Sequence, residues 1–455
     1  MGVFSSRAAG RGGHGAAIVR IALAALVAGS LGSPRVFAAE NSAGPDDEDV
    51  VHRTVGVGPR GIGGRPAPER ESKTVYVPVV LIAVPQPTEP RFSTRAPFAT
   101  MRAIEAYKQI QAAGGWQPIP DGLELWKGVK GKQVLLLRER LQISGDLVEQ
   151  SKHPKEYDDV LTQAVARFQA RHGLMTTGFV GPDTLMALNV PVGERIRQLE
   201  VNLPRLMALQ ALPSGRSLVV NIPSQELEAS ENGVLASRHR VVAGKVDRQT
   251  PLFQSAVNLV QFNPVWNVPT SIARKDLVPL IQADGEFLEQ HNYTVFDVSS
   301  GQRVVVDPAR IDWNDPNVSN RYRLMQGRGG KNPLGSMVLR FPNPYDVYMH
   351  DTSHPELFTL TTRLNSSGCV RIQGVEEVVT WLLRGVGSWD AARVRDAAET
   401  VEPVSVQLPA PVPVRTIYIT AWADPDGTPQ FRDDVYSLDV SAQADLHTSS
   451  IASAF

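Results

Sequence analysis

The chain has 455 residues, with 46 Lys and Arg against 47 Asp and Glu, so its formal net charge is −1. This length allows two or three domains, and the balanced charge gives no electrostatic case for a nucleic-acid or acidic membrane partner. A single cysteine, Cys369, excludes a disulfide framework within the chain. We find no internal repeat, phosphate-binding loop or Cys/His metal cluster, and we therefore expect no cofactor and no metal.

Residues 1–38 have the pattern of a secretory signal peptide. Three arginines precede an apolar run that ends near Leu31, and a small-residue cleavage site follows at Ala38. The run is shorter than the roughly 20 residues that a membrane span needs. We expect export to the periplasm, with attachment to the inner membrane only if the signal is not cleaved. A lone thiol in an oxidising compartment is a liability, which favours a working cysteine.

Residues 39–95 are rich in Gly, Pro and charge, which predicts a disordered tether. One apolar island, residues 75–84, interrupts it. The island is either a strand that docks elsewhere or a sticky part of the linker.

Two segments, residues 96–130 and 191–213, are predicted to form a helical scaffold. Residues 100–113 place apolar side chains on one helical face. Residues 194–209 also read as a helix, but Pro204 is expected to kink or shorten it.

Between these segments lies a compact pattern of three helices, residues 131–190. The expected helices are 134–141, 159–172 and 182–188, separated by glycine-containing turns. The string LTQAVARFQARHGLMTTGFVGPDTLMALN resembles the type-one peptidoglycan-binding module. The alternative is a helical spacer that binds no ligand.

Strands dominate from Ser217, and Asn232-Gly233 is a strong hairpin signal. Helices are expected at 272–288 and 375–383. The expected strands are residues 218–222, 226–229, 234–237, 256–262, 293–296, 304–306, 322–325, 337–341 and 416–422.

The stretch YMHDTSHPELFTLTTRLNSSGCVR carries the chemistry of the chain. A lone cysteine with a distant His is a candidate nucleophile and base, because the two residues need only meet in the fold. A free thiol has a pKa near ~8.5, so a neighbouring imidazole is needed to take its proton. Here Cys369 follows His350, and Gly368 lets the backbone approach a substrate closely. The alternative is a buried, inert cysteine.

This stretch resembles the catalytic motif of the L,D-transpeptidase family, whose usual form is a His, a spacer, then Ser/Thr-His-Gly-Cys-x-Arg. The chain departs from it at Ser367, which stands where most members have the second His. The same Ser-Ser-Gly-Cys variant, after a Tyr-x-His-Asp-Thr strand, is typical of the large periplasmic branch. His350 is therefore the expected base, and His354, which precedes Pro355, is its rival.

The resemblance implies a multidomain α+β protein with a mostly-β catalytic domain, a small three-helix peptidoglycan-binding module and a helical scaffold. The catalytic domain would be residues 214–410, with residues 272–332 as a lid insertion over the substrate groove. The C-terminal hairpin would be residues 411–440, and a tail would follow at 441–455.

The resemblance also implies roles at the site. Cys369 would attack a stem-peptide carbonyl, His350 would move the proton, and N–H groups near Gly368 and Cys369 would hold the oxyanion. For Arg371, holding substrate and forming a structural ion pair remain open alternatives. Tyr348 and Trp266 would line the groove, with core packing as the alternative. We also expect Ser366 and Ser367 to fix the tautomer of the imidazole, through either a hydroxyl or a carbonyl.

The implied reaction cross-links the third residues of two stem peptides and releases D-alanine. The alternatives are water or a wall-anchored protein as acceptor, or a wall-binding protein without activity. The expected partners are stem peptides, glycan strands and other cell-wall synthesis proteins, and no nucleic acid.

Overall fold

The computed structural model describes residues 81–121, 124–209, 215–400 and 402–440, together with the backbone of three N-terminal strands. The chain divides into two units, Gly2–Leu81 and Ile82–Phe455. In the first unit, β1 (Val3–Arg7), β2 (Ile18–Ala22) and β3 (Val75–Tyr76) form a small sheet. The rest of the expected signal peptide, most of the tether and the tail lie outside the described residues. No described helix is long and apolar enough to cross a membrane.

The largest sheet of the second unit has nine strands and closes on itself. Its order is β14-β6-β15-β13-β12-β7-β16-β4-β5, and β5 at one end also pairs with β6. Closure leaves no long free edge for another chain to pair with. The strands are β4 (Arg216–Asn221), β5 (Glu226–Glu231), β6 (Val234–Gly244), β7 (Phe253–Phe262), β12 (Met337–Arg340), β13 (Met349–His350), β14 (Leu364–Ser366), β15 (Val370–Ile372) and β16 (Val404–Ile417).

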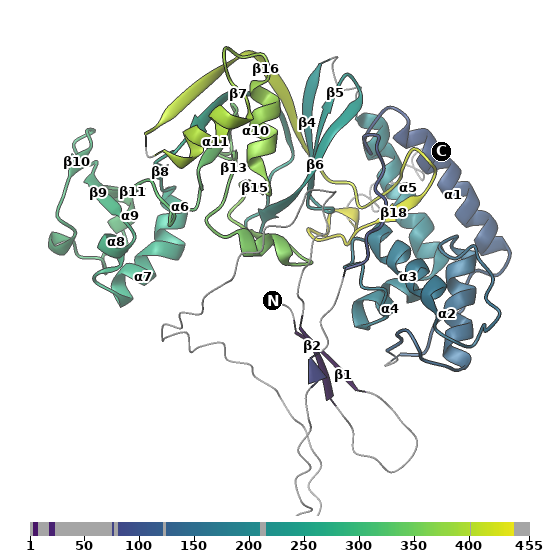
Figure 1. Ribbon diagram of the computed structural model, residues 1–455. Helices are drawn as coiled ribbons and strands as arrows, with labels where there is room; N and C mark the ends of the chain where they lie inside the picture. The colour runs from purple at the N-terminus through teal and green to yellow at the C-terminus, as the bar shows by residue number, and fades with distance from the viewer. Residues whose placement is uncertain are drawn as a thin grey trace, which may run out of the picture. The chain divides into compact units, whose positions relative to one another are not determined.

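Two helices complete the core of this sheet. Helices α10 (Val375–Leu383) and α11 (Ala391–Glu399) lie together beside the strands (Figure 1). Val378 and Leu383 of α10 are fully buried against strand residues such as Val260. The predicted hairpin at Asn232-Gly233 is confirmed, because φ is positive at both residues, 53° and 78°. A type I′ turn requires this, and its twist matches that of the flanking strands.

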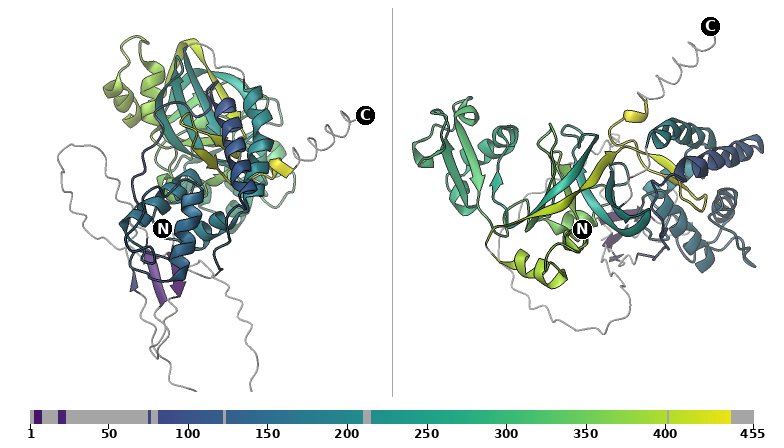
Figure 2. Two further views of the ribbon diagram at one scale, coloured as in Figure 1. Left: turned by 90° about the vertical axis from the view of Figure 1, so that its right-hand side faces the viewer. Right: turned by 90° about the horizontal axis from the view of Figure 1, so that it is seen from above.

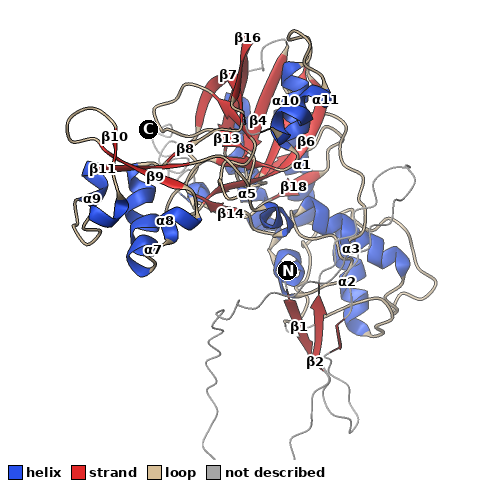
Figure 3. Ribbon diagram, turned by 60° about the vertical axis from the view of Figure 1, so that its left-hand side comes forward, coloured by secondary structure: helices blue, strands red, loops and turns tan. Residues whose placement is uncertain are grey.

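A second sheet, of order β10-β9-β11-β8, carries its own helices (Figure 3). Its core contains Trp266, Leu288, Val295 and Leu324. We keep for this part the name lid insertion, which was expected at residues 272–332. It consists of β8 (Trp266–Asn267), α6 (Thr270–Ile272), a π-helix (Ala273–Leu277), α7 (Val278–Ala283), α8 (Phe287–Gln290), β9 (Tyr293–Asp297), β10 (Val304–Val305), α9 (Val318–Arg321) and β11 (Tyr322–Gln326).

The single helix expected at 272–288 is wrong, because the segment is broken into the π-helix, α7 and α8. The missing N–H of Pro279 interrupts the regular hydrogen-bond ladder near the π-helix, and the helix itself ends where Asp284 turns to an extended backbone. Wider π-type turns are often found near functional sites.

The helical part consists of α1 (Ala96–Ala112), α2 (Lys132–Ile143), α3 (Asp159–Arg171), α4 (Pro182–Asn189) and α5 (Val192–Ala208). The long helices α1 and α5 lie side by side (Figure 2), and Ile104 and Tyr107 share a core with Ile196 and Leu199. Together with the mostly-β domain, this confirms the multidomain α+β class.

The expectation that Pro204 shortens its helix is wrong, because α5 continues past it to Ala208. Tertiary contacts hold the last turn in place. Leu206 is buried, and Arg205 donates hydrogen bonds to the carboxylate of Asp439 and to the carbonyl of Leu438. These contacts outweigh the local cost of the proline.

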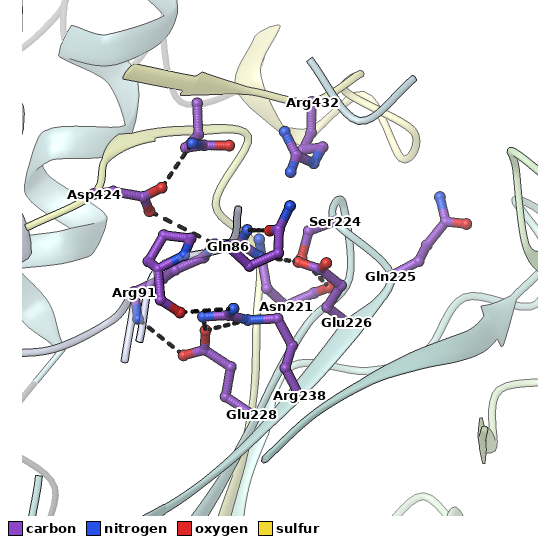
Figure 4. Close-up of polar contacts among 12 residues, drawn as sticks. Gln86, Arg91, Asn221, Ser224, Gln225, Glu226, Glu228, Arg238, Asp424 and Arg432 are labelled. Atoms are coloured by element: carbon purple, nitrogen blue, oxygen red, sulfur yellow. Dashed lines mark hydrogen bonds and ion pairs between the residues drawn. The ribbon is translucent and has the colours of Figure 1, made fainter. Parts of the chain in front are cut away.

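The prediction that the disordered tether continues to residue 95 is also wrong, because residues 82–95 pack against the folded part of the chain. The backbone of Ile82 bonds to the carbonyl of Thr176 at 2.7 Å. Arg91, only 3% exposed, forms ion pairs with Glu226 and, at 3.6 Å, with Asp424 (Figure 4). Burial of a charge is tolerated where partners surround it, and single-sequence composition does not reveal such partners.

Arg91→Met should therefore lower the free energy of unfolding by about 3–5 kcal/mol, because it leaves buried carboxylates without their cation. The matched control is Arg95→Met. Its ion pair with Glu89 joins side chains that are 72% and 51% exposed, so its loss should cost less than about 1 kcal/mol. Urea unfolding of both variants measures the difference, and equal costs would contradict the role given to Arg91.

Candidate active site

The site is built by one strand pairing. Strands β13 and β15 are parallel, with Met349 opposite Val370 and His350 opposite Arg371. The N–H of Val370 donates to the carbonyl of Tyr348 at 3.1 Å, which extends the pairing back by one residue. Because side chains alternate between the faces of a strand, this register places His350 and the residue before Val370 on one face. That residue is Cys369.

These side chains line a cavity of about 560 Å³. One wall belongs to the nine-stranded sheet and its loops, and the other to the lid insertion. Gly368 lies in the adjoining turn. The other predicted site residues all line the cavity: Cys369, His350, Arg371, Tyr348, Ser366, Ser367 and Trp266.

Cys369 is a free cysteine, and the residue as a whole is half-buried. Burial raises the pKa of this thiol to about 11, against the opposing effects of the Tyr348 N–H and the charges of Arg340 and Arg371. The thiol is therefore protonated at neutral pH when no ligand is present.

His350 is 4% exposed. Burial and the positive charge of Arg371 lower the pKa of this imidazole to about 3. Its Nδ1 has no hydrogen-bond partner. The ring is thus neutral over the physiological range and has a lone pair available for a proton. Among the described residues, no hydrogen bond joins it to the thiol of Cys369.

The turn before Cys369 is held by Ser366. Its hydroxyl accepts from the N–H of Gly368 at 3.1 Å and donates to the carbonyl of Cys369 at 2.5 Å. Gly368 has φ = +114°, a conformation that only glycine adopts at low cost. Since the Gly368 N–H is already bonded, the N–H of Cys369 is the better candidate for an oxyanion.

The expected role of the two serines in fixing the imidazole tautomer is wrong for both hydroxyls. The hydroxyl of Ser366 is bonded within the turn before Cys369, to Gly368 and Cys369. The hydroxyl of Ser367 accepts a hydrogen bond from Arg248 at 3.0 Å. Arg248 in turn donates two hydrogen bonds to Asp276 of the lid insertion, one of them at 2.7 Å. Ser367 therefore connects the motif to the lid insertion.

Sequence reasoning missed two residues that support the motif from behind. The hydroxyl of Thr250 donates to the carbonyl of Gly368 at 2.9 Å. The N–H of Thr250 donates to the phenol of Tyr436 at 3.2 Å, and that phenol donates to the carbonyl of Gly244 at 2.6 Å. These residues lie far apart in the chain, so no local pattern could have identified them.

Arg371 forms no ion pair with any described residue. Its Nη1 donates to the hydroxyl of Thr352 at 3.3 Å, and its Nε has no partner. Burial lowers the pKa of its guanidinium. The structural ion pair that we left open is not present, and the cation is available to a ligand in the cavity.

The other predicted residues keep mixed roles. The ring of Tyr348 lies 5.8 Å from that of His350 and has the guanidinium of Arg340 above it at 4.5 Å. Trp266 lines the cavity and also belongs to the core of the lid insertion. The rival base, His354, is exposed and lies 3.1 Å from Glu356.

Asp351 follows His350 directly in the chain but lies outside the cavity lining. Its carboxylate accepts from the N–H and the hydroxyl of Ser336, both at 2.9 Å. It therefore holds a turn and does not orient His350.

Fold and site together define a mostly-β domain with a cysteine and a neutral histidine on one face of a cavity. Residues 215–406 match the family model described as "L,D-transpeptidase catalytic domain", and residues 130–188 match the one described as "Putative peptidoglycan binding domain". Residues 215–406 are therefore similar to catalytic domains of the L,D-transpeptidase family, and residues 130–188 are similar to peptidoglycan-binding domains, as the sequence motifs had indicated.

A curated relative is similar over part of the chain. It is described as "Putative L,D-transpeptidase" of Haemophilus influenzae and is 33% identical over 243 residues, which are 53% of this chain. The match spans 48% of the relative's own length.

Solved structures of L,D-transpeptidases also align with the chain. One from Stackebrandtia nassauensis is 13% identical, covers 66% of this chain and 97% of its own, and has a TM-score of 0.26. One from Xylanimonas cellulosilytica is 16% identical, covers 66% and 100%, and has a TM-score of 0.21.

The raised pKa of about 11 predicts how Cys369 reacts with iodoacetamide. Only the thiolate is alkylated, so the rate should rise about tenfold per pH unit from pH 7 to pH 10. Intact mass follows the reaction, and Cys369→Ala provides the blank. A rate that is already constant between pH 5 and pH 8 would instead indicate a thiolate–imidazolium pair and would contradict this electrostatic picture.

Proposed function

We propose that the protein is a peptidoglycan L,D-transpeptidase that acts through a thioester on Cys369. The observation that carries the proposal is the shared face of Cys369 and His350 in a cavity that also contains Arg371. The matches to the catalytic and peptidoglycan-binding domains support the same substrate.

In the first step, the sulfur of Cys369 attacks the carbonyl carbon of the third stem residue. The neutral ring of His350 takes the thiol proton as the C–S bond forms. The N–H of Cys369 faces the developing oxyanion and stabilises it. When the C–N bond breaks, the imidazolium returns the proton to the nitrogen of the departing D-alanine.

In the second step, the side-chain amine of another stem peptide attacks the thioester. His350 accepts the amine proton and transfers it to the sulfur as the C–S bond breaks. The products are a cross-link between two third residues and a restored thiol. A lid over the cavity, formed by residues 272–332, would exclude water and favour the amine.

The alternatives to this function are a different acceptor for the acyl group or a protein without enzymatic activity. With water as acceptor the protein is a carboxypeptidase or amidase, and with a wall-anchored protein it is an anchoring enzyme. The remaining alternative is a wall-binding protein whose catalytic domain has lost its activity. The shared face of Cys369 and His350 favours catalysis. The expected N-terminal signal supports action outside the cytoplasm.

Product analysis tests the proposal. The mature protein, with Cys369→Ala alongside, is incubated with purified disaccharide-tetrapeptide, and the products are weighed by mass spectrometry. We expect dimers that have lost one D-alanine, and none with the variant. Tripeptide monomers would establish hydrolysis instead, and no change in either sample would contradict the enzymatic proposal.

A further inference from the structure

The cavity has an excess of positive charge that the reaction steps above do not use. Its lining contains two carboxylates, Asp276 and Asp346. Against them stand five cations: Lys245, Arg248, Lys275, Lys331 and Arg371.

Two of these cations are already engaged. Both terminal nitrogens of Arg248 donate hydrogen bonds to the carboxylate of Asp276. The ammonium of Lys331 donates to the carbonyl of Gln290 at 3.0 Å. Lys245 and Lys275 form no ion pair with any described residue. Arg371, as described above, also has none.

The two lysines come from opposite walls of the cavity. Lys245 follows the last residue of β6, and its N–H donates to the carbonyl of Ser366 at 2.9 Å, which places it beside the catalytic motif. Lys275 lies in the π-helix of the lid insertion, next to Asp276 in sequence. The Arg248 hydrogen bond is the main cause of the lowered pKa of Asp276, and the charges of both lysines lower it further.

Lys245 and Lys275 are both exposed, so water screens part of the repulsion between them, but like charges on facing walls still favour an anion between them. One carboxylate between them would replace this repulsion by two charge-assisted contacts. Such an anion would also favour closure of the lid insertion onto the sheet.

We infer that Lys245 and Lys275 select stem peptides by a free carboxylate, and that stems with that carboxylate amidated bind less well. The inference rests on the proposed function for its substrate. A stem tetrapeptide has up to three free carboxylates. The first belongs to the second residue, whose side chain forms the peptide bond. The second is the C-terminal carboxylate, and the third is present where the third residue is a dicarboxylic amino acid. A carboxamide has the same shape but no charge, so it isolates the electrostatic effect.

Binding is measured on the Cys369→Ala protein, so that no turnover interferes. Four disaccharide-tetrapeptides are titrated calorimetrically: one with all carboxylates free, and three with a single carboxamide at one of these positions. We expect one of the three to bind about tenfold more weakly than the free peptide, which corresponds to the loss of one charge-assisted contact.

Lys245→Met and Lys275→Met are each made in the Cys369→Ala protein. Both should reduce this discrimination, because the free peptide binds more weakly while the affinity for the amidated peptide stays the same. The control is Lys152→Met, which removes an exposed lysine of the helical module and should keep the full discrimination.

Equal affinity for all four peptides, or full discrimination in both lysine variants, would overturn the inference. Turnover of the same peptides by the wild-type protein distinguishes failure of the carboxylate selection from failure of the proposed function. Discrimination in binding without any product would contradict the proposed reaction, whereas products formed equally from all four would contradict only the selection.

Discussion

The parallel pairing of β13 with β15 is the constraint on which the site depends. It places His350 opposite Arg371 and brings Cys369 to the same face. A shift of one residue would move the thiol to the other face, away from the imidazole. The bonds around the turn, from Ser366 to Gly368 and from Thr250 to Gly368, hold the start of β15 and so protect this register.

The same packing sets the electrostatics of the site. Burial moves the two pKa values apart, to about 3 for His350 and about 11 for Cys369. The resting pair is consequently neutral, and charge separation is deferred until a substrate carbonyl is in place. A neutral pair also costs less to bury than two ions do. In a cavity with excess positive charge, the anionic sulfur and oxyanion that arise during reaction are the species that gain most.

The sequence was sufficient to predict features that depend on residues close together in the chain. The Asn232-Gly233 turn was predicted from a local pattern, the Ser-Ser-Gly-Cys motif and the helical module were identified by resemblance, and the cavity does contain the predicted side chains. It failed where distant parts of the chain decide the outcome. Arg91 has buried partners more than a hundred residues away, and Tyr436 supports Thr250 across the fold. Pro204 shows the same effect, because tertiary contacts preserve the helix that contains it.

The most direct test of the account is the rate at which a carbapenem, an acylating mimic of the stem peptide, forms a covalent adduct with the protein. Intact mass is followed for the wild type, His350→Gln and Cys369→Ala. We expect one adduct per wild-type chain and none on Cys369→Ala. Loss of the base in His350→Gln should slow acylation by about a hundredfold or more. An adduct that forms on Cys369→Ala, or equally fast on His350→Gln, would contradict the pairing of these two residues.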